Sequence, residues 1–241
     1  MAEHPLVDIE RIDLAANSRG AMVAGLIAAE EAKNVLELGV WEGAFAAEML
    51  GACPGIESYW MLDPWRQLAD WDKPFNIDDG PFEAAYQAAM SATEFAAGKR
   101  RVLRGTTQEK IAEIPDASLD LAYVDGDHTL RGVAVDLIAV WPKLKEGGLL
   151  VGDDFTPSIW QHGPFYEPTA VFPFAVHFAE GHDCPIIALS RNQFAIRKGV
   201  GGFRFIDPSG RYPGTGLRAQ VGALAQGQSL AKRVAHRVLR R

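Results

Sequence analysis

Two apolar runs of strand length, each ending in acidic residues, most constrain what this chain can fold into. Residues 119–128 have the sequence LDLAYVDGDH, and residues 149–154 have the sequence LLVGDD. The segment between them, Arg131 to Lys145, has a helical pattern that Gly147 and Gly148 close. A strand, a helix and a strand in this order predict a parallel pair whose carboxyl ends share one edge of a sheet.

The acidic ends of these two strands should converge on one crevice, at the edge where open α/β sheets bind ligands. The side chains concerned are Asp125, Asp127, His128, Asp153 and Asp154. Four carboxylates in one crevice repel one another unless a cation or protons intervene, so the pattern indicates a metal site with a base beside it. The alternative is that Asp127 caps the next helix and the others are loop acids. One acid would fit that alternative, but four acids favour a site.

A second constraint is the glycine turn in residues 34–43, NVLELGVWEG, which joins a short apolar strand to a helix that starts at Ala44. A dinucleotide fingerprint needs G-x-G-x-x-G, and here Trp41 stands where the middle glycine should be. The turn therefore disfavours NAD or FAD and favours a ligand without phosphates. Gly39 permits a tight turn and a close approach of a ligand to the backbone.

The next two strands also end in polar positions. Asp63 follows the run 58–62, roughly twenty residues past the glycine turn, where an acid accepts hydrogen bonds from ribose hydroxyls. Its alternative interpretation is a helix cap before Pro64. Trp65 is placed either to pack against a base or to cover the sheet edge. Thr106, after the strand 101–104, is available to an adenine ring.

Strand and helix alternate five times, and a hairpin from Pro185 to Arg197 follows. This pattern predicts an α/β, three-layer sandwich with a seven-stranded, mostly parallel, Rossmann-like sheet and an antiparallel terminal strand. Residues 1–33 form a predicted N-terminal helical cover, 34–198 the main domain, and 199–241 a Gly/Pro-rich segment with a basic C-terminal tail. Arg19, in the cover, either reaches a ligand carboxylate or lies on the surface; the surface is the simpler interpretation.

Residues 155–168 are rich in rings and turns, and they follow the second acidic strand directly. We expect a lid over the site in which Trp160, Phe165 and Tyr166 face a substrate.

Charge and composition narrow the class of partner. The net charge is −7, but the seven basic residues from Arg211 onward leave 17 basic against 31 acidic residues, or −14, in the rest of the chain. An acidic body disfavours nucleic-acid binding. No run approaches the roughly twenty apolar residues of a membrane span, and we see no secretory signal. Two cysteines without disulfide or zinc spacing agree with a reducing compartment, so we expect a cytoplasmic protein, and a homo-oligomer is possible.

With these positions in view, the chain resembles class I S-adenosylmethionine-dependent methyltransferases from about Asn34 to Lys198. Residues 35–43, VLELGVWEG, are similar to the nucleotide-binding loop of catechol O-methyltransferase. Residues 123–128, YVDGDH, and 148–154, GLLVGDD, resemble small bacterial O-methyltransferases, including metal-dependent enzymes that act on sugars of macrolide and aminocoumarin antibiotics. The loop alone is of modest specificity, whereas the loop and the acidic motifs together are specific for the superfamily.

The resemblance implies a role for each matched position. S-adenosylmethionine would be bound by Glu37, Gly39, Trp41, Gly43, Asp63, Trp65, Thr106 and Asp125. Glu37 and Gly39 match positions that hold its amino-acid end, and Gly43 closes the turn. Asp125, Asp153 and Asp154 match three ligands of Mg²⁺ or Mn²⁺. In the catechol and caffeoyl-coenzyme A enzymes, the third ligand is asparagine.

His128 matches the position of the catalytic lysine of the catechol enzyme, and it would be the base. Asp127 is the rival base, or the residue that orients His128. The expected reaction is O-methylation of a small-molecule acceptor, a sugar or a catechol-like diol. A bound metal lowers the pKa of a coordinated hydroxyl, and neutral imidazole is a competent base near neutral pH. A metal-independent class I methyltransferase and a cofactor-binding protein without turnover are the alternatives.

Overall fold

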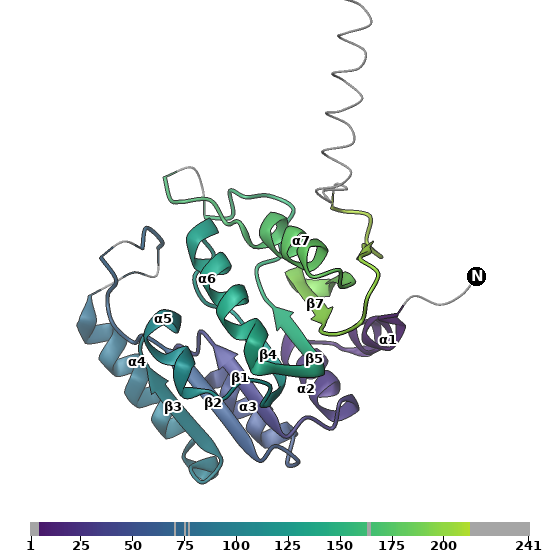
Figure 1. The fold of residues 1–241 in the computed structure, drawn as a ribbon. Coiled ribbons are helices and arrows are strands. Elements are labelled where there is room, and N and C mark those ends of the chain that lie inside the picture. The colour runs from purple at the N-terminus through teal and green to yellow at the C-terminus, as the bar shows by residue number, and fades with distance from the viewer. Residues whose placement is uncertain (1–4, 70, 75, 77, 163–164, 213–241) are drawn as a thin grey trace, which may run out of the picture.

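The computed structural model describes residues 5–69, 71–74, 76, 78–162 and 165–212, which form a central sheet with helices on both faces (Figure 1). The strands are β1 (Asn34–Leu38), β2 (Ser58–Asp63), β3 (Arg100–Arg104), β4 (Leu119–Val124), β5 (Leu144–Gly152), β6 (Ile186–Leu189), β7 (Gln193–Arg197) and β8 (Phe205–Ile206). The α-helices are α1 (Val7–Ala15), α2 (Arg19–Ala29), α3 (Ala44–Ala52), α4 (Asp79–Ala92), α5 (Thr107–Lys110), α6 (Leu130–Val140) and α7 (Val171–Gly181). Short 3-10 turns are η1 (Glu94–Ala96), η2 (Ile111–Glu113), η3 (Trp141–Lys143) and η4 (Ser190–Asn192).

The strand order is β3-β2-β1-β4-β5-β7-β6-β8. Neighbouring strands from β3 to β5 are parallel, and β7 is antiparallel to both β5 and β6. This arrangement confirms the predicted α/β class with its mostly parallel sheet and antiparallel strand. The described residues form eight strands rather than seven, because Phe205 and Ile206 pair with β6. That short strand comes from the Gly/Pro-rich segment, where no strand was expected.

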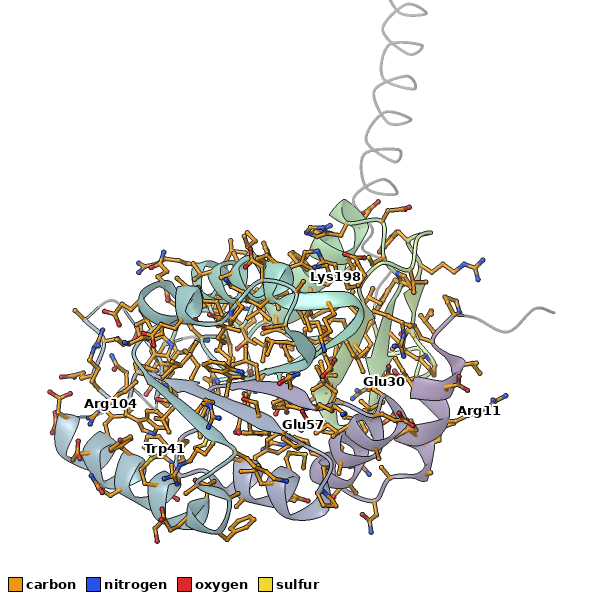
Figure 2. The ribbon with its side chains drawn as sticks, turned by 60° about the horizontal axis from the view of Figure 1, so that its bottom comes forward. Arg11, Glu30, Trp41, Glu57, Arg104 and Lys198 are labelled. Carbon is orange, nitrogen blue, oxygen red and sulfur yellow. The ribbon has the colours of Figure 1, made fainter. Side chains whose placement is uncertain are left out.

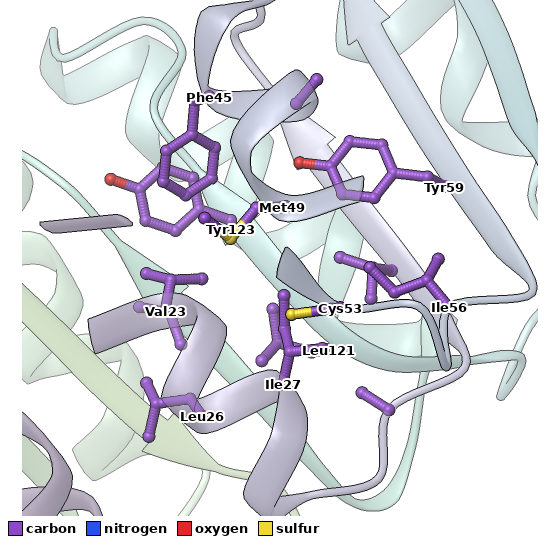
Figure 3. Close-up of a cluster of buried hydrophobic side chains, with 14 of the residues drawn as sticks. Val23, Leu26, Ile27, Phe45, Met49, Cys53, Ile56, Tyr59, Leu121 and Tyr123 are labelled. Carbon is purple, nitrogen blue, oxygen red and sulfur yellow. The ribbon is translucent and has the colours of Figure 1, made fainter. Parts of the chain in front are cut away.

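Alternating strand residues face two separate apolar layers. Val35, Tyr59 and Tyr123 pack with α1 to α4 on one face, where they meet residues such as Met49 (Figure 3). On the other face, Leu36 and its equivalents on neighbouring strands pack with α6 and α7. Because the connections of parallel strands cross over the faces, the loops at the carboxyl ends of β1, β2, β4 and β5 lie together at one edge of the sheet. These loops build the site.

One predicted boundary is wrong. The helical pattern 131–145 ends earlier than expected, at Val140, and β5 begins at Leu144, before the two glycines. Gly147 has a φ of +80°, and the pairing of β4 with β5 shifts register between Leu119 and Leu121. The glycines therefore form an irregularity within a strand rather than the end of a helix.

The N-terminal helices α1 and α2 pack in one apolar layer, and they are tied to the hairpin of β6 and β7. Ser190 donates its amide to Asp13 Oδ2 at 2.8 Å. Arg197 makes a two-pronged ion pair with Glu30, at 2.7 and 2.6 Å, just beyond the end of α2, where Glu30 is labelled in Figure 2. These contacts fix α2 against the sheet.

An aromatic cluster surrounds Phe155, three residues beyond the end of β5. Its members are Phe155, Phe172, Phe194, Phe205 and Tyr212, with ring centroids of neighbouring pairs 4.9 to 6.2 Å apart. The Tyr212 hydroxyl donates a hydrogen bond to the carbonyl oxygen of Phe155. The residues after β8 therefore return to the core beside the acidic loop. The basic tail predicted beyond them lies outside the described residues.

In the part of the chain that the structure describes, no helix is long and apolar enough to cross a membrane.

Candidate functional site

A cavity of about 540 Å³ opens at the carboxyl ends of the parallel strands, and its volume is that of a small-molecule site. The predicted site residues that line it are Gly39, Trp41, Asp63, Thr106, Asp125, Asp127, His128, Asp153 and Asp154. We call the part over β1, β2 and β3 the loop end. The part over β4 and β5 is the acidic end. One continuous space thus joins the two motifs that the sequence singled out.

Steric contacts require both glycines of the turn after β1. Gly39 has a φ of +87°, and a β-carbon there would lie 1.9 Å from the carbonyl oxygen of Asp125. Gly43 has a φ of +76° and caps α3, and a β-carbon there would lie 2.7 Å from Cα of Ala89. Gly39 therefore lets the end of β4 approach the loop, and Gly43 lets α3 pack on α4.

Asp63 organises the loop end through backbone amides. Its Oδ2 accepts hydrogen bonds from the amides of Val40 at 2.8 Å and Trp41 at 3.0 Å, and its Oδ1 accepts one from Trp65 at 2.8 Å. Asp63 is 8% exposed, and burial raises its pKa although the three amides act in the opposite direction. The carboxylate thus holds the glycine turn in place. Its predicted contact with a ribose stays a prediction.

Three residues assigned to the cofactor lie outside the cavity lining: Gly43, Trp65 and Glu37. Trp65 is 1% exposed; its indole donates to the carbonyl oxygen of Trp41 at 2.7 Å, so it braces the loop from behind instead of packing against a base. Glu37 is also 1% exposed, and it accepts a hydrogen bond from the Tyr59 hydroxyl at 2.8 Å. Burial raises the pKa of Glu37 well above its usual value. Glu37 shares a strand face with Val35 and points into the α1–α4 layer, outside the cavity lining. Its predicted contact with the amino-acid end of the cofactor stays a prediction.

A buried acid that sequence reasoning missed lies below the loop end. Asp136 is in the middle of α6 and lines the cavity. Its Oδ1 accepts a hydrogen bond from Thr107 Oγ1 at 2.6 Å, next to Thr106, and burial raises its pKa to about 7. An acid inside an apolar helix pattern was the available signal, since such a residue is rarely buried without a partner.

At the acidic end, His128 bridges two of the predicted metal ligands. Its Nε2 lies 3.2 Å from Asp125 Oδ1, and its Nδ1 lies 2.6 Å from Asp154 Oδ2. Burial lowers the pKa of His128, but hydrogen bonds to these two carboxylates outweigh burial and raise it to about 10. One ligand atom from each of the three residues lies within 4.8 Å of the others, so this oxygen and nitrogen donor set fits a divalent cation.

Asp153, the third predicted metal ligand, is bound by different partners. Arg19 makes an ion pair with its Oδ2 and also with Asp125 Oδ2, the latter at 3.3 Å, and Gln193 donates to its Oδ1. Burial and the neighbouring Asp125 raise the pKa of Asp153 to about 6. Arg19 therefore reaches the site carboxylates, and the simpler interpretation of a surface arginine is wrong. Its partners are 106 and 134 residues away, so no local pattern could pair them.

Asp154 adopts a left-handed backbone conformation with a φ of +55°. Its amide donates to Asp153 Oδ1 at 2.7 Å, and the next amide, that of Phe155, donates to the carbonyl oxygen of Asn192 at 2.8 Å. A non-glycine residue in this region carries a backbone cost that the surroundings must sustain. The two adjacent acids therefore face different partners within one cavity.

Asp127 makes the contacts of a helix-capping residue. Its Oδ1 accepts from the Trp71 indole at 3.0 Å and from the Thr129 amide at 2.9 Å, and its Oδ2 accepts from the Thr129 hydroxyl at 3.0 Å. Thr129 in turn caps α6 by accepting from the amide of Gly132 at 3.0 Å. The capping interpretation thus describes its contacts, and its role as rival base stays a prediction.

The lid contributes polar residues rather than rings. Gln161 and His162 line the cavity, and Gln161 donates to Asp154 Oδ1 at 2.5 Å. Phe165 is 91% exposed and Trp160 is also exposed, and neither ring lines the cavity. Tyr166 is also absent from the cavity lining, so the expectation that these rings face a substrate in the cavity is wrong for all three residues.

Comparison with known proteins agrees with this geometry. Residues 36–155, from β1 through Phe155, match a family described as methyltransferase domain. The chain belongs to this methyltransferase family. It is a class I S-adenosylmethionine-dependent methyltransferase, and the matched segment contains the glycine turn, Asp63 and the acidic end of the cavity.

Solved methyltransferases share the fold at low sequence identity. A Staphylococcus aureus protein provisionally named caffeoyl-CoA O-methyltransferase is 14% identical, with 80% of this chain and 90% of that one covered and a TM-score of 0.56. The O-methyltransferase NovP is 14% identical, with 80% of each chain covered and a TM-score of 0.52. An O-methyltransferase from Bacillus cereus, solved with S-adenosylhomocysteine, is 15% identical, with 82% and 92% covered and a TM-score of 0.52. Among curated protein sequences, none is significantly similar to this methyltransferase.

Proposed function

We propose that this methyltransferase transfers the methyl group of S-adenosylmethionine to a hydroxyl of a small-molecule diol, a sugar or a catechol-like compound, with the help of a divalent cation. The observation that carries the proposal is the single cavity that joins the loop end to the acidic end. A donor held at the glycine turn and an acceptor at the carboxylates would share one space. The names of the similar structures, which include O-methyltransferases, support oxygen as the acceptor atom.

The loop end suits the methyl donor. The turn lacks the glycine pattern that cradles a pyrophosphate, and the cofactor has no phosphate. Trp41, labelled in Figure 2, and Phe82 give this end apolar lining, with ring centroids 5.7 Å apart. Thr106 and Asp63 provide polar groups beside them. This mixture of apolar walls and a few polar groups is that of a cofactor site.

At the acidic end, Asp125, Asp153 and Asp154 would hold Mg²⁺ or Mn²⁺, since these cations prefer oxygen ligands. A bound cation would supply a lowered pKa of the acceptor hydroxyl. His128 would accept the hydroxyl proton, because its imidazole lines the cavity beside the proposed metal ligands. For that role the ring must be neutral. Asp125 and Asp154 must therefore be paired with the metal ion, so that they no longer stabilise the protonated ring.

The first test is direct. The purified protein is mixed with S-adenosylmethionine, Mg²⁺ and a panel of vicinal diols, and methylated products are measured by mass spectrometry. Cofactor binding is measured separately by calorimetry. We expect micromolar-range binding and transfer to at least one diol class. A protein that does not bind the cofactor would contradict the proposal.

The ligand role of Asp153 has its own test. Replacing Asp153 by Ala should weaken Mn²⁺ affinity by roughly tenfold or more, because one charged oxygen ligand is lost. Asp116→Ala is the control, since Asp116 is exposed and pairs with Lys143 outside the cavity. An unchanged affinity in Asp153→Ala would remove this residue from the ligand set.

A second candidate is metal-independent methyl transfer, and one observation favours it. Arg19 and His128 already contribute positive charge among the three carboxylates. Such charges reduce the repulsion that otherwise calls for a metal. Turnover that is unaffected by EDTA would favour this candidate over the first.

A further inference from the structure

Arg19 contacts the same carboxylates that a bound metal would need. It is the first residue of α2, and the same guanidinium nitrogen contacts Asp153 Oδ2 and Asp125 Oδ2. These are two of the three carboxylates to which the proposed function assigns the cation. Arg19 therefore bridges the ligands while itself lining the cavity.

The ion pairs and the proposed ligand set compete for the same oxygens. The compact donor set in this arrangement is Asp125, His128 and Asp154, and it leaves out Asp153. In this arrangement Gln193 donates to Asp153 Oδ1, and Arg19 pairs with Asp153 Oδ2. A divalent cation that recruits Asp153 must displace the guanidinium from that oxygen, because two cations in contact with one carboxylate oxygen repel each other.

The surroundings of Arg19 allow such a displacement without movement of the backbone. Ser18 caps α2 by accepting the amide of Ala21 at 3.0 Å, which fixes the helix start. The Arg19 side chain is 40% exposed, and its guanidinium lies 5.1 Å from the ring centre of Phe45 and 6.0 Å from that of Tyr123. These two rings stack on each other at 4.5 Å (Figure 3). These rings and the open cavity can receive the Arg19 guanidinium once it leaves Asp153.

We propose that Arg19 is a tethered competitor of the divalent cation. It pairs with Asp125 and Asp153 when no metal is bound, and it thereby sets the metal concentration at which the site fills. This inference rests on the proposed function, since it assumes that the carboxylates bind a metal. The inference adds that the Arg19 guanidinium competes with the metal for Asp125 and Asp153.

The experiment measures Mn²⁺ binding to the full chain by isothermal titration calorimetry, without substrate. Arg19→Met should bind Mn²⁺ about three- to tenfold more tightly than the wild type, because the metal no longer breaks a partly exposed ion pair. Arg19→Lys, which keeps the positive charge on a side chain of different length and shape, should show a smaller gain. Arg11→Met is the matched control: it removes the same charge from the neighbouring helix, where Arg11 pairs with the exposed Asp8.

The possible outcomes separate the inference from the proposed function. Equal or weaker Mn²⁺ binding in Arg19→Met would overturn the inference and leave the proposed function standing. Absence of Mn²⁺ binding in the wild type and the variants would overturn both the inference and the role of the metal. If Arg19→Met does not fold, Arg19→Gln provides the same neutral comparison. A gain in Arg11→Met as large as that in Arg19→Met would show a net-charge effect and would also overturn the inference.

Discussion

The two ends of the cavity are built in different ways. At the loop end, backbone groups are the partners: the Asp63 carboxylate accepts hydrogen bonds from three backbone amides. Position 39 must be glycine because a β-carbon there would clash with the carbonyl oxygen of Asp125. At the acidic end, charged side chains satisfy one another, as in the contacts of Arg19 with Asp153 and of His128 with Asp154.

This difference separates a fixed part of the site from an adaptable one. Backbone partners cannot rotate away, so the loop end is preorganised for a ligand of constant shape. Side-chain ion pairs can exchange partners when a ligand or cation arrives, at the cost of leaving other charges unpaired. We therefore expect substitutions at the acidic end to change turnover and substitutions at the loop end to change cofactor affinity.

The largest expected effect is that of His128→Ala. Loss of the candidate base should lower turnover by about two to four orders of magnitude, while cofactor affinity stays nearly unchanged because the loop end is intact. Steady-state kinetics and calorimetry with S-adenosylhomocysteine measure the two quantities. Turnover like that of the wild type would transfer the role of base to Asp127 and would end the functional division between the two ends.

Gly39→Ala should have the next largest effect, and it should lower cofactor affinity where His128→Ala lowers turnover. A β-carbon 1.9 Å from a carbonyl oxygen, at a φ of +87°, forces the loop to move. Cofactor affinity should fall by roughly tenfold to a hundredfold, in line with a backbone strain of about 1–3 kcal/mol. Gly51→Ala, near the end of α3, is the matched control, since a β-carbon there meets no atom within 4 Å. Equal cofactor affinities in the two variants would show that the turn is not rigid.

The smallest effect concerns Asp136, between the two ends. Burial raises its pKa to about 7, so the folded state binds a proton that the unfolded state releases near its ordinary pKa of about 4. Stability from this group is therefore present at low pH and is lost as the pH rises to about 7. Between about pH 5 and about pH 8, the free energy of unfolding should fall by roughly 1–3 kcal/mol more in the wild type than in Asp136→Asn. Urea unfolding measures the difference, and parallel pH profiles would contradict it.

The sequence predicted best what local pattern determines. Apolar runs of strand length and their acidic or glycine ends located β1, β2, β4 and β5, and the parallel crossover rule brought Asp125 and Asp153 to one cavity. These inferences needed only residues that are neighbours in the chain and a handedness that parallel sheets share. The count of strands was less accurate, because the two residues of β8 are too few to form a pattern.

What could not be predicted are the partners of each site residue. Arg19 and Gln193 contact Asp153, and Trp71 contacts Asp127, from distant parts of the chain. The local sequence around these three residues does not predict the contacts. The assignments of Glu37 and Trp65 to the cofactor followed a motif position, which does not say which layer a side chain faces. Strand alternation does carry that information for Glu37, since it has the same parity as the buried Val35.

The aromatic cluster around Phe155 has a consequence for chain length. Phe155 directly follows the left-handed Asp154, and its carbonyl oxygen and ring are both held by Tyr212. A truncation between Ile206 and Tyr212 would remove no described residue that lines the cavity, yet it would remove the hydrogen bond and the ring contact that Tyr212 makes with Phe155, the neighbour of Asp154. The last described residues therefore support the acidic end of the cavity through Phe155. We expect their removal to lower the activity.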